Sequence, residues 1–207
     1  VEGGQVHLAG CQLTDHPFLR LSFAADGDAE VRHIFVAPDG SSVSDELVPS
    51  WPENMPSPAP ATLPVTAREG AAAVYLPACI NRIFGAPQGA GEDQHLPAAL
   101  VAVSARAGKP LWIPPDVGGH CCGTPWSSKG YADGHAHMVA TTAAAIDRWT
   151  DGGRLPLVID ATSCALGLYE DVLPTIDEAR RPVLMDSIAW AHDELLEGLP
   201  EPRRVGR

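Results

Sequence analysis

The sequence contains the stretch Leu155-Pro156-Leu157-Val158-Ile159-Asp160-Ala161-Thr162-Ser163-Cys164, in which a short apolar run is followed at once by polar residues and a cysteine. A short apolar run between turn-forming residues is typical of a strand that is buried on both faces of a sheet. Three further segments have this character, the last of them weakly: 72–76, 110–113 and 182–184. The chain is therefore predicted to contain a buried sheet.

Segments with helical spacing separate these apolar runs, at 80–84, 96–107 and 131–149. Asp186 is predicted to cap a last helix, and Asp160 to cap the turn that follows its strand. Two helices have a predicted buried face: Leu96, Leu100, Val103 and Ala107 in one, and Ile188, Ala191 or His192, and Leu195 in the other. Alternating strands and helices with short connections predict an α/β fold, a Rossmann-like parallel sheet flanked by helices, over residues 71–207.

The beginning of the chain does not follow this alternation. Residues 1–40 contain two segments of alternating apolar and polar residues, 18–23 and 31–36, on either side of a turn signal at 26–28. This pattern predicts a short antiparallel β segment, either a hairpin or a meander. Residues 41–70 are rich in proline, so they are predicted to form an extended, semi-rigid linker instead of a helix or a central strand.

Charge and cysteine content limit the classes of function. The 207 residues include 26 acidic and 14 basic ones, which gives a formal net charge of -12. A nucleic acid or an anionic membrane requires a basic partner surface, so neither is expected as a partner. No apolar run approaches the roughly 20 residues of a transmembrane helix. The five cysteines are an odd count in a chain long enough to fold without disulfides, which indicates cytoplasmic thiols used for a metal or for catalysis.

Four of the cysteines follow predicted strands: Cys79 the first, Cys121 and Cys122 the second, and Cys164 the third. The carboxyl ends of parallel strands form one ligand-binding edge of an open sheet, so the four thiols are predicted to lie together. Gathered thiolates on glycine-rich loops are the ligands of a soft metal or an iron–sulfur cluster. Redox or nucleophilic thiol chemistry and inert packing are the alternatives. Cys11 lies in the N-terminal segment and is interpreted as unrelated to this site.

Charged residues and histidines flank the cysteine loops. Arg82 and Lys129 are predicted cofactor-binding residues that stabilise thiolates electrostatically, with ordinary surface charge as the alternative. His120 adjoins the cysteine pair and is a candidate hydrogen-bond donor to the site or a proton carrier. His135 and His137 are two residues apart on a predicted helix and do not share a face, which favours solvent-exposed side chains.

Three segments around the cysteines resemble the cysteine-rich CCG domain shared by heterodisulfide reductases, glycolate oxidase iron–sulfur proteins and bacterial FAD- and iron–sulfur-containing D-lactate dehydrogenases. They are Tyr75-Leu76-Pro77-Ala78-Cys79-Ile80-Asn81-Arg82-Ile83-Phe84-Gly85, His120-Cys121-Cys122-Gly123-Thr124-Pro125-Trp126-Ser127-Ser128-Lys129-Gly130 and Asp160-Ala161-Thr162-Ser163-Cys164. Segments 48–56 and 185–196 also resemble the D-lactate dehydrogenase type. The resemblance covers about residues 43–207 and does not extend to residues 1–40.

The resemblance implies that a 4Fe-4S cluster, or zinc in some members, is bound by Cys79, Cys121, Cys122 and Cys164. The heterodisulfide reductase form ends in Cys-x-x-Cys, and this chain has Ala161 at the first of these two positions. Four thiols remain, which suit an ordinary four-iron cluster or a zinc ion but not a cluster with five thiolates. Many members of the family carry two such domains, and this sequence contains one.

The function implied by the resemblance is electron transfer within a flavin-dependent D-lactate or related 2-hydroxy-acid dehydrogenase. The FAD is expected on a part of the parent protein outside this sequence, together with a ferredoxin-like domain. A quinone or cytochrome is the expected electron acceptor, and the expected location is the cytoplasm, including the inner face of the membrane through partners. Two alternatives stay open: a structural zinc-binding docking domain without catalysis, and a thiol–disulfide redox site at Cys121 and Cys122.

Overall fold

The computed structural model describes residues 4–5, 22–24, 32–34, 58–86 and 95–199. The chain divides into two compact units, Val1–Met55 and Pro56–Arg207. The division falls inside the predicted linker at 41–70, of which residues 41–57 lie outside the described part. In the remainder of the linker, residues 58–70, the structure has no helix and no extended strand; Pro58 forms an isolated bridge with Phe84.

The first unit contains a three-stranded antiparallel sheet in the order β1-β2-β3. Its strands are β1 (Gly4–Gln5), β2 (Ser22–Ala24) and β3 (Arg32–Ile34). Phe23 pairs with His33 across β2 and β3, in the two segments where the alternating pattern predicts antiparallel strands. The pairing of β2 with β1 was not predicted, because two residues are too few to show a periodic pattern.

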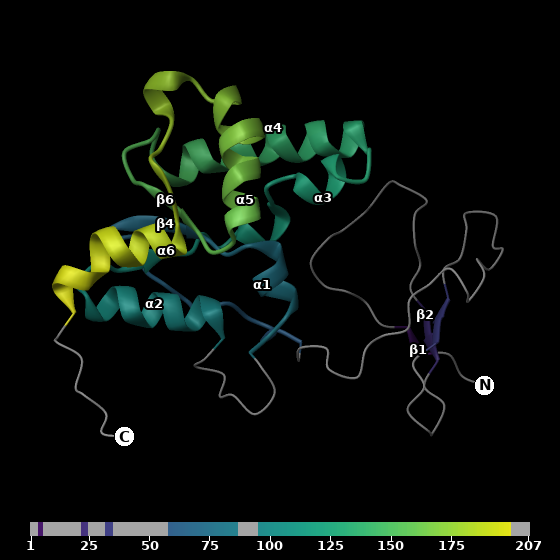
Figure 1. The fold of residues 1–207 in the computed structure, drawn as a ribbon, viewed down its shortest axis with the longest axis horizontal. Coiled ribbons are helices and arrows are strands. Elements are labelled where there is room, and N and C mark those ends of the chain that lie inside the picture. The colour runs from purple at the N-terminus through teal and green to yellow at the C-terminus, as the bar shows by residue number, and fades with distance from the viewer. Residues whose placement is uncertain (1–3, 6–21, 25–31, 35–57, 87–94, 200–207) are drawn as a thin grey trace. The chain divides into compact units, whose positions relative to one another are not determined.

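The second unit contains a four-stranded, all-parallel sheet in the order β5-β4-β6-β7, which confirms the predicted α/β fold (Figure 1). Its strands are β4 (Ala73–Leu76), β5 (Leu111–Trp112), β6 (Leu157–Ile159) and β7 (Leu184–Asp186). The two central strands are fully buried, as their unbroken apolar runs predict. Leu76 pairs with Ile159, so β4 and β6 end side by side, and the residues that follow them begin at the same edge of the sheet.

Helices cover both faces of this sheet (Figure 1). They are α1 (Cys79–Ile83), α2 (Leu96–Arg106), α3 (Thr124–Ser127), α4 (Ala132–Trp149), α5 (Thr162–Gly167) and α6 (Ser187–Trp190). Short helical turns extend two of these: η4 (Leu168–Val172) follows α5, and η7 (Ala191–Leu195) follows α6. In Figure 1, α2 and α6 lie on one side of the strands and α4 lies on the other. The Asp186 side chain accepts hydrogen bonds from the N–H groups of Ile188 and Ala189, so the predicted cap of the last helix is confirmed.

Two predicted helix faces are each confirmed except at one residue. In α2 Leu100 is buried and Val103 and Ala107 pack against the core as predicted, whereas Leu96 is exposed. In the last helical segment Ile188 is 73 % exposed, and the buried residues are Trp190 and Leu195. Their separation by five residues fits the π-helical turn η7 and not the α-helical spacing from which the face was predicted.

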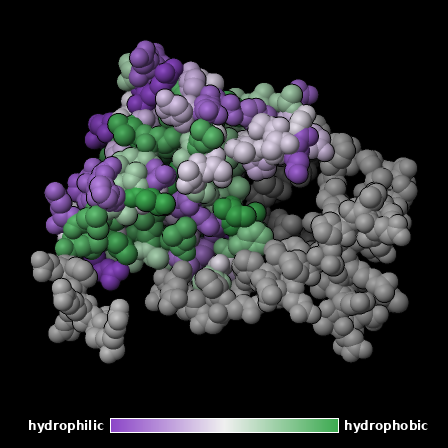
Figure 2. Space-filling view, viewed as in Figure 1, coloured by the Kyte–Doolittle hydropathy of each residue, from purple (hydrophilic) through white to green (hydrophobic). Residues whose placement is uncertain are grey.

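A polar bond inside the apolar layer joins the helices on this side of the sheet. The Trp190 indole N–H donates to the Ser104 hydroxyl at 3.0 Å, and both residues are buried. Buried polar groups require such partners, so this bond fixes how α6 packs against α2. Figure 2 shows apolar residues interspersed with hydrophilic ones on the visible face of the described part. Among the described residues, no helix combines the length and the apolar character that crossing a membrane requires.

Candidate metal or redox centre

The cysteine-bearing segments follow three strands of the parallel sheet. Cys79 is the first residue of α1 after β4, and Cys164 lies in α5 after β6. Cys121 and Cys122 lie between the short turn Val117–Gly119 and α3, in the connection after β5. The chain leaves β4 toward β5 on one side, while β6 and β7 lie on the other, so the strand order reverses between β4 and β6. Ligands of open parallel sheets bind at such a reversal, beyond the carboxyl ends of the strands.

Two of the thiols, Cys122 and Cys164, are buried and lie close enough to shift the pKa of each other. Interaction with Cys164 lowers the pKa of Cys122 to about 6, against the opposing effect of burial, and the Thr124 hydroxyl, 3.2 Å from the Cys122 sulfur, lowers the pKa further. Interaction with Cys122 raises the pKa of Cys164, and burial adds to the rise. The two thiols therefore favour a state in which one of them carries a proton and the other does not.

The other two cysteines join this pair from neighbouring segments. Cys79 contributes to raising the pKa of Cys164, after Cys122 and burial, so Cys79 lies within electrostatic range of Cys164. Cys121 is bonded to Cys122 along the chain, and its sulfur accepts a hydrogen bond from the Gly123 N–H at 3.4 Å. The structure thus brings Cys122 and Cys164 close together, with Cys79 within electrostatic range of Cys164 and Cys121 adjacent in sequence to Cys122. Cys11 lies outside the described residues.

Gly123 and its neighbours give the cysteine loop its close packing. Gly123 has φ +85°, a left-handed conformation, and a Cβ atom there would lie 2.8 Å from Cδ2 of His135. Thr124 packs equally closely against α5, because a Cβ on Gly167 would lie 2.5 Å from its hydroxyl oxygen. The prediction that His135 is a solvated helix residue is therefore wrong: it packs on the cysteine loop, with Nε2 3.2 Å from the Asp171 carboxylate. His137 is exposed, as predicted.

Asp160 connects the ends of the two central strands. One carboxylate oxygen accepts a hydrogen bond from the Tyr75 hydroxyl at 2.5 Å, and the other accepts the Ala78 N–H at 2.6 Å. Burial, followed by the charge of Asp160, raises the pKa of Tyr75, so the phenol stays protonated and donates. The predicted cap is wrong, since no side chain caps α5 and the carboxylate instead crosses to the segment of β4.

Tyr75 belongs to this site and was not identified from the sequence. Its only signal was a phenol within an apolar run, because a hydroxyl in a fully buried strand needs a polar partner. That partner, Asp160, is 85 positions further along the chain.

Arg82 and Lys129, the two predicted cofactor-binding residues, have different surroundings. The Arg82 guanidinium donates to the carbonyl oxygens of Val117 at 2.9 Å, Gly118 at 3.0 Å and His120 at 2.5 Å. It thereby binds the loop that leads into Cys121. Lys129 is exposed, and its side chain has no hydrogen bond or ion pair with the described residues. A cofactor-binding role for either residue stays a prediction.

His120 is held next to the cysteine pair by a small network. Its ring packs edge-on against Trp149 with ring centroids 4.9 Å apart. The Trp149 indole donates to Asp116 at 2.8 Å, and Arg148 donates to the other carboxylate oxygen of Asp116 at 2.5 Å. Burial, with the positive charges of Arg148 and Arg82, lowers the pKa of His120 despite the opposing charge of Asp116. These surroundings therefore favour the neutral form of the imidazole.

The groups around the cysteine loop are of the chemical types that bind an iron–sulfur cluster or zinc, but the ligand atoms of the described residues do not surround a common point. Nε of Arg82 and Nδ1 of His120 are buried and have no hydrogen-bond partner among the described residues, which is typical of groups that face a ligand. Thiolates suit iron–sulfur clusters and zinc. Within the described ranges, however, no three His, Cys, Asp or Glu side chains are grouped closely enough to hold a metal ion. Binding thus requires the thiols to lose protons and turn toward a common point.

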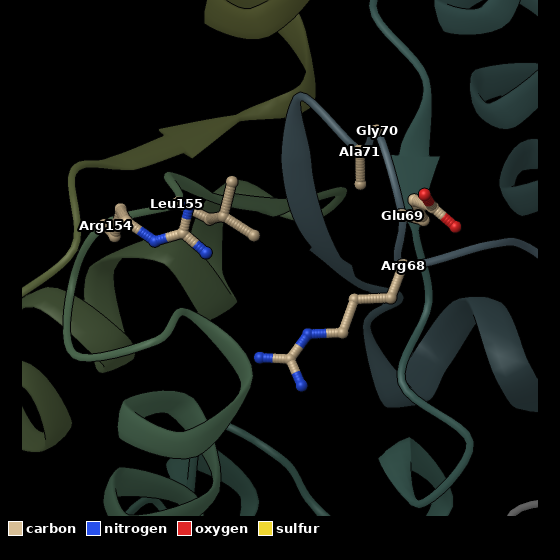
Figure 3. Close-up of a pocket in the computed structure, with 6 residues that line it drawn as sticks. All are labelled: Arg68, Glu69, Gly70, Ala71, Arg154 and Leu155. Carbon is tan, nitrogen blue, oxygen red and sulfur yellow. The ribbon is translucent and has the colours of Figure 1, made fainter.

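The opposite edge of the sheet has a hollow of a different character (Figure 3). Its volume is about 560 Å³, and it is lined by Arg68, Glu69, Gly70, Ala71, Arg154 and Leu155. These residues precede β4 and β6, so the hollow lies at the amino ends of the strands and contains no cysteine. Both arginines are already engaged, Arg68 over the Trp112 ring at 4.9 Å and Arg154 with Asp151 at 2.7 Å.

No protein-family model, curated protein or solved structure matches the chain.

Proposed function

We propose that this chain is an electron-transfer module whose four cysteines, Cys79, Cys121, Cys122 and Cys164, bind an iron–sulfur cluster. The observation that carries the proposal is the convergence of three cysteine-bearing segments at the strand-order reversal, with Cys122 and Cys79 both within electrostatic range of Cys164. Such a convergence from distant parts of the chain is typical of a ligand site and not of incidental packing of single cysteines.

The chain's own residues supply three conditions for such a site. The pKa of Cys122 is lowered to about 6 by Cys164 and the Thr124 hydroxyl, so a thiolate ligand is available near neutrality. Arg82 Nε and His120 Nδ1, which are buried without a partner among the described residues, are the groups that would hydrogen-bond a bound sulfur. Both paired sulfurs are buried, which limits the access of water. When bound, a 4Fe-4S cluster supplies one-electron transfer at a potential set by these surroundings.

The wider role proposed for the module is electron relay in a flavin-dependent D-lactate or 2-hydroxy-acid dehydrogenase, on the basis of the motif resemblance. In such a reaction, FAD on another part of the parent protein would accept a hydride from the substrate. A cluster held by the four cysteines would supply single-electron transfer toward a quinone or cytochrome. The chain's acidic charge fits neither a nucleic acid nor an anionic surface as the acceptor partner.

Anaerobic purification, followed by measurement of iron, acid-labile sulfide and zinc, tests the proposal. The expected result is a brown protein with about four irons and about four sulfides per chain. A colourless protein with one tightly bound zinc would overturn electron transfer in favour of a structural zinc site. A protein that stays free of metal after reconstitution with iron and sulfide would overturn metal binding altogether.

A second candidate function is favoured by one observation, the burial of Cys122 and Cys164 close enough for each to shift the pKa of the other. In this alternative the Cys122 thiolate attacks a disulfide substrate, which releases one thiolate and forms a mixed disulfide. Cys164 then loses its proton and attacks the Cys122 sulfur, which releases the second thiol and leaves a Cys122–Cys164 disulfide. Two electrons thus pass from the pair to the substrate. The pair differs from the adjacent Cys121 and Cys122 considered from the sequence.

Turnover of glutathione disulfide by the reduced, metal-free protein tests this alternative. Loss of two thiols per chain, abolished in both Cys122→Ser and Cys164→Ser but not in Cys121→Ser, would support it. Retention of all thiols in the presence of the disulfide would exclude it.

A further inference from the structure

Two side chains connect the cysteine-bearing segments to one another, and α1 is the element on which both connections meet. The first is Asp160, which lies between β6 and α5. Besides the bonds to Tyr75 and Ala78, the backbone oxygen of Asp160 accepts a hydrogen bond from the Asn81 side chain at 3.3 Å. Ala78 precedes Cys79 directly, and Asn81 lies in α1. Asp160 therefore ties the segment of Cys164 to the segment of Cys79.

The second connection is Arg82, which lies in α1 three positions after Cys79. Its two terminal nitrogens donate to three carbonyl oxygens in the segment 117–120 that leads into Cys121. A planar guanidinium reaches several acceptors at once, which a lysine ammonium, as a compact point charge, does not. Arg82 therefore ties the loop of Cys121 and Cys122 to the helix that begins with Cys79.

We propose that Asp160 and Arg82 are positioning residues that hold the three cysteine-bearing segments together before any metal binds. The consequence for metal uptake rests on the proposed function, in which these thiols are the ligands. The grouping of the thiols in the metal-free protein does not rest on it, because every bond named above joins protein atoms only.

The chemistry of the site favours positioning over a direct electrostatic role. A buried carboxylate next to thiols opposes their ionisation, so the charge of Asp160 works against thiolate ligands. Its two oxygens are instead accounted for by Tyr75 and Ala78, both at the end of β4. The terminal nitrogens of Arg82 are likewise turned to carbonyl oxygens. Outer groups of this kind orient ligands, and their loss typically weakens metal binding by about 10-fold to 100-fold.

The test compares variants of the full chain in reduced, metal-free form, with two probes. Cobalt(II), followed by its thiolate absorption, reports metal affinity, and phenylarsine oxide, which bridges two close thiols, reports thiol grouping without a metal. Asp160→Ala and Arg82→Lys are expected to weaken cobalt binding by about 10-fold to 100-fold and to slow the arsenical reaction. Asp160→Asn, which keeps an acceptor for the Ala78 N–H and a partner for the Tyr75 hydroxyl, is expected to remain within about three-fold of wild type.

A matched control is Arg180→Lys, which also replaces a guanidinium with an ammonium group but on another part of the unit. Nε and Nη2 of Arg180 donate to the two carboxylate oxygens of Asp147 at 2.7 and 2.6 Å. This variant should leave both probes unchanged. The proposal would be overturned if Arg82→Lys or Asp160→Ala bound cobalt and reacted with the arsenical as the wild type does. It would also be overturned if Asp160→Asn bound cobalt as weakly as Asp160→Ala, because the charge of Asp160 would then be the relevant property. If Asp160→Ala does not fold, as shown by circular dichroism, Arg82→Lys and Asp160→Asn decide the matter.

The two probes separate this inference from the proposed function. A wild-type protein that binds neither cobalt nor iron but reacts with the arsenical faster than Arg82→Lys would contradict the metal site and support positioning. A wild-type protein that binds metal with the same affinity as Arg82→Lys and Asp160→Ala would support the metal site and overturn positioning.

Discussion

The two edges of the parallel sheet differ in how they use charged side chains. At the carboxyl edge Asp160 is 7 % exposed, and both of its carboxylate oxygens bond to groups on another strand segment. At the amino edge Arg154 and Asp151 pair within one turn of chain, with side chains 70 % and 54 % exposed, beside an open hollow (Figure 3). The buried hydrogen bonds of Asp160 join distant segments of the chain in a low-dielectric environment. The exposed ion pair joins residues of one short turn and contributes little to stability.

The largest expected effect is that of Asp160→Ala on stability. The substitution leaves the buried Tyr75 hydroxyl and the Ala78 N–H without acceptors, and each unsatisfied group costs about 1–3 kcal/mol. Denaturant unfolding of the metal-free protein should therefore show a loss of about 3 kcal/mol or more. Tyr75→Phe is the control that removes one partner only, so it should cost less. A loss under about 1 kcal/mol for Asp160→Ala would contradict the view that this edge is bound together by the carboxylate.

The next effect in size concerns Gly123, at the cysteine loop. Alanine there meets both a left-handed backbone and a contact of 2.8 Å with His135, so Gly123→Ala should cost about 2 kcal/mol. Gly130→Ala is a matched control, since Gly130 has φ +78° but nothing within 4 Å of an added Cβ. It should cost only the backbone strain, about 1 kcal/mol. Equal losses in thermal or denaturant unfolding would show that the His135 contact is unimportant.

A pH series examines the carboxyl edge without altering the backbone. The pKa of Cys122 is lowered to about 6 in the folded protein, so its contribution to stability is present above the unfolded pKa and lost as pH falls through about 6. The raised pKa of Cys164 acts in the opposite sense, with stability lost as pH rises above the ordinary thiol range. The metal-free protein should therefore gain stability from pH 6 toward pH 9, relative to Cys122→Ser measured in parallel. A difference between the two that is independent of pH would contradict the assignment.

The smallest effect is expected at the amino edge. Arg154→Met removes an exposed pair, so the free energy of unfolding should change by no more than about 0.5 kcal/mol. The change should shrink further in high salt, which screens exposed charges. A loss approaching that of Asp160→Ala would remove the distinction between the two edges.

The sequence permitted prediction of the parallel sheet and of the thiols' place at its edge, because both depend on local signals. Each buried strand is a continuous apolar run, and each cysteine segment follows one directly. The partner of Asp160 was not predictable in this way, since Tyr75 is 85 positions away and its pattern shows only a buried strand. The exposure of Ile188 depends on a π-helical turn, for which the apolar periodicity of the sequence has no signal. The hydrogen bonds that Arg82 donates were not predictable either, because they depend on where the segment 117–120 folds.

The iron content of a series of single cysteine variants tests whether Cys79, Cys121, Cys122 and Cys164 bind an iron–sulfur cluster. Cys79→Ser, Cys121→Ser, Cys122→Ser, Cys164→Ser and Cys11→Ser are prepared anaerobically and reconstituted with iron and sulfide, and the iron per chain is measured with the visible absorption. About four irons are expected in the wild type and in Cys11→Ser, with a marked loss of iron and colour in each of the other four variants. Full iron retention in Cys79→Ser or Cys164→Ser, or loss in Cys11→Ser alone, would contradict cluster binding by these four cysteines.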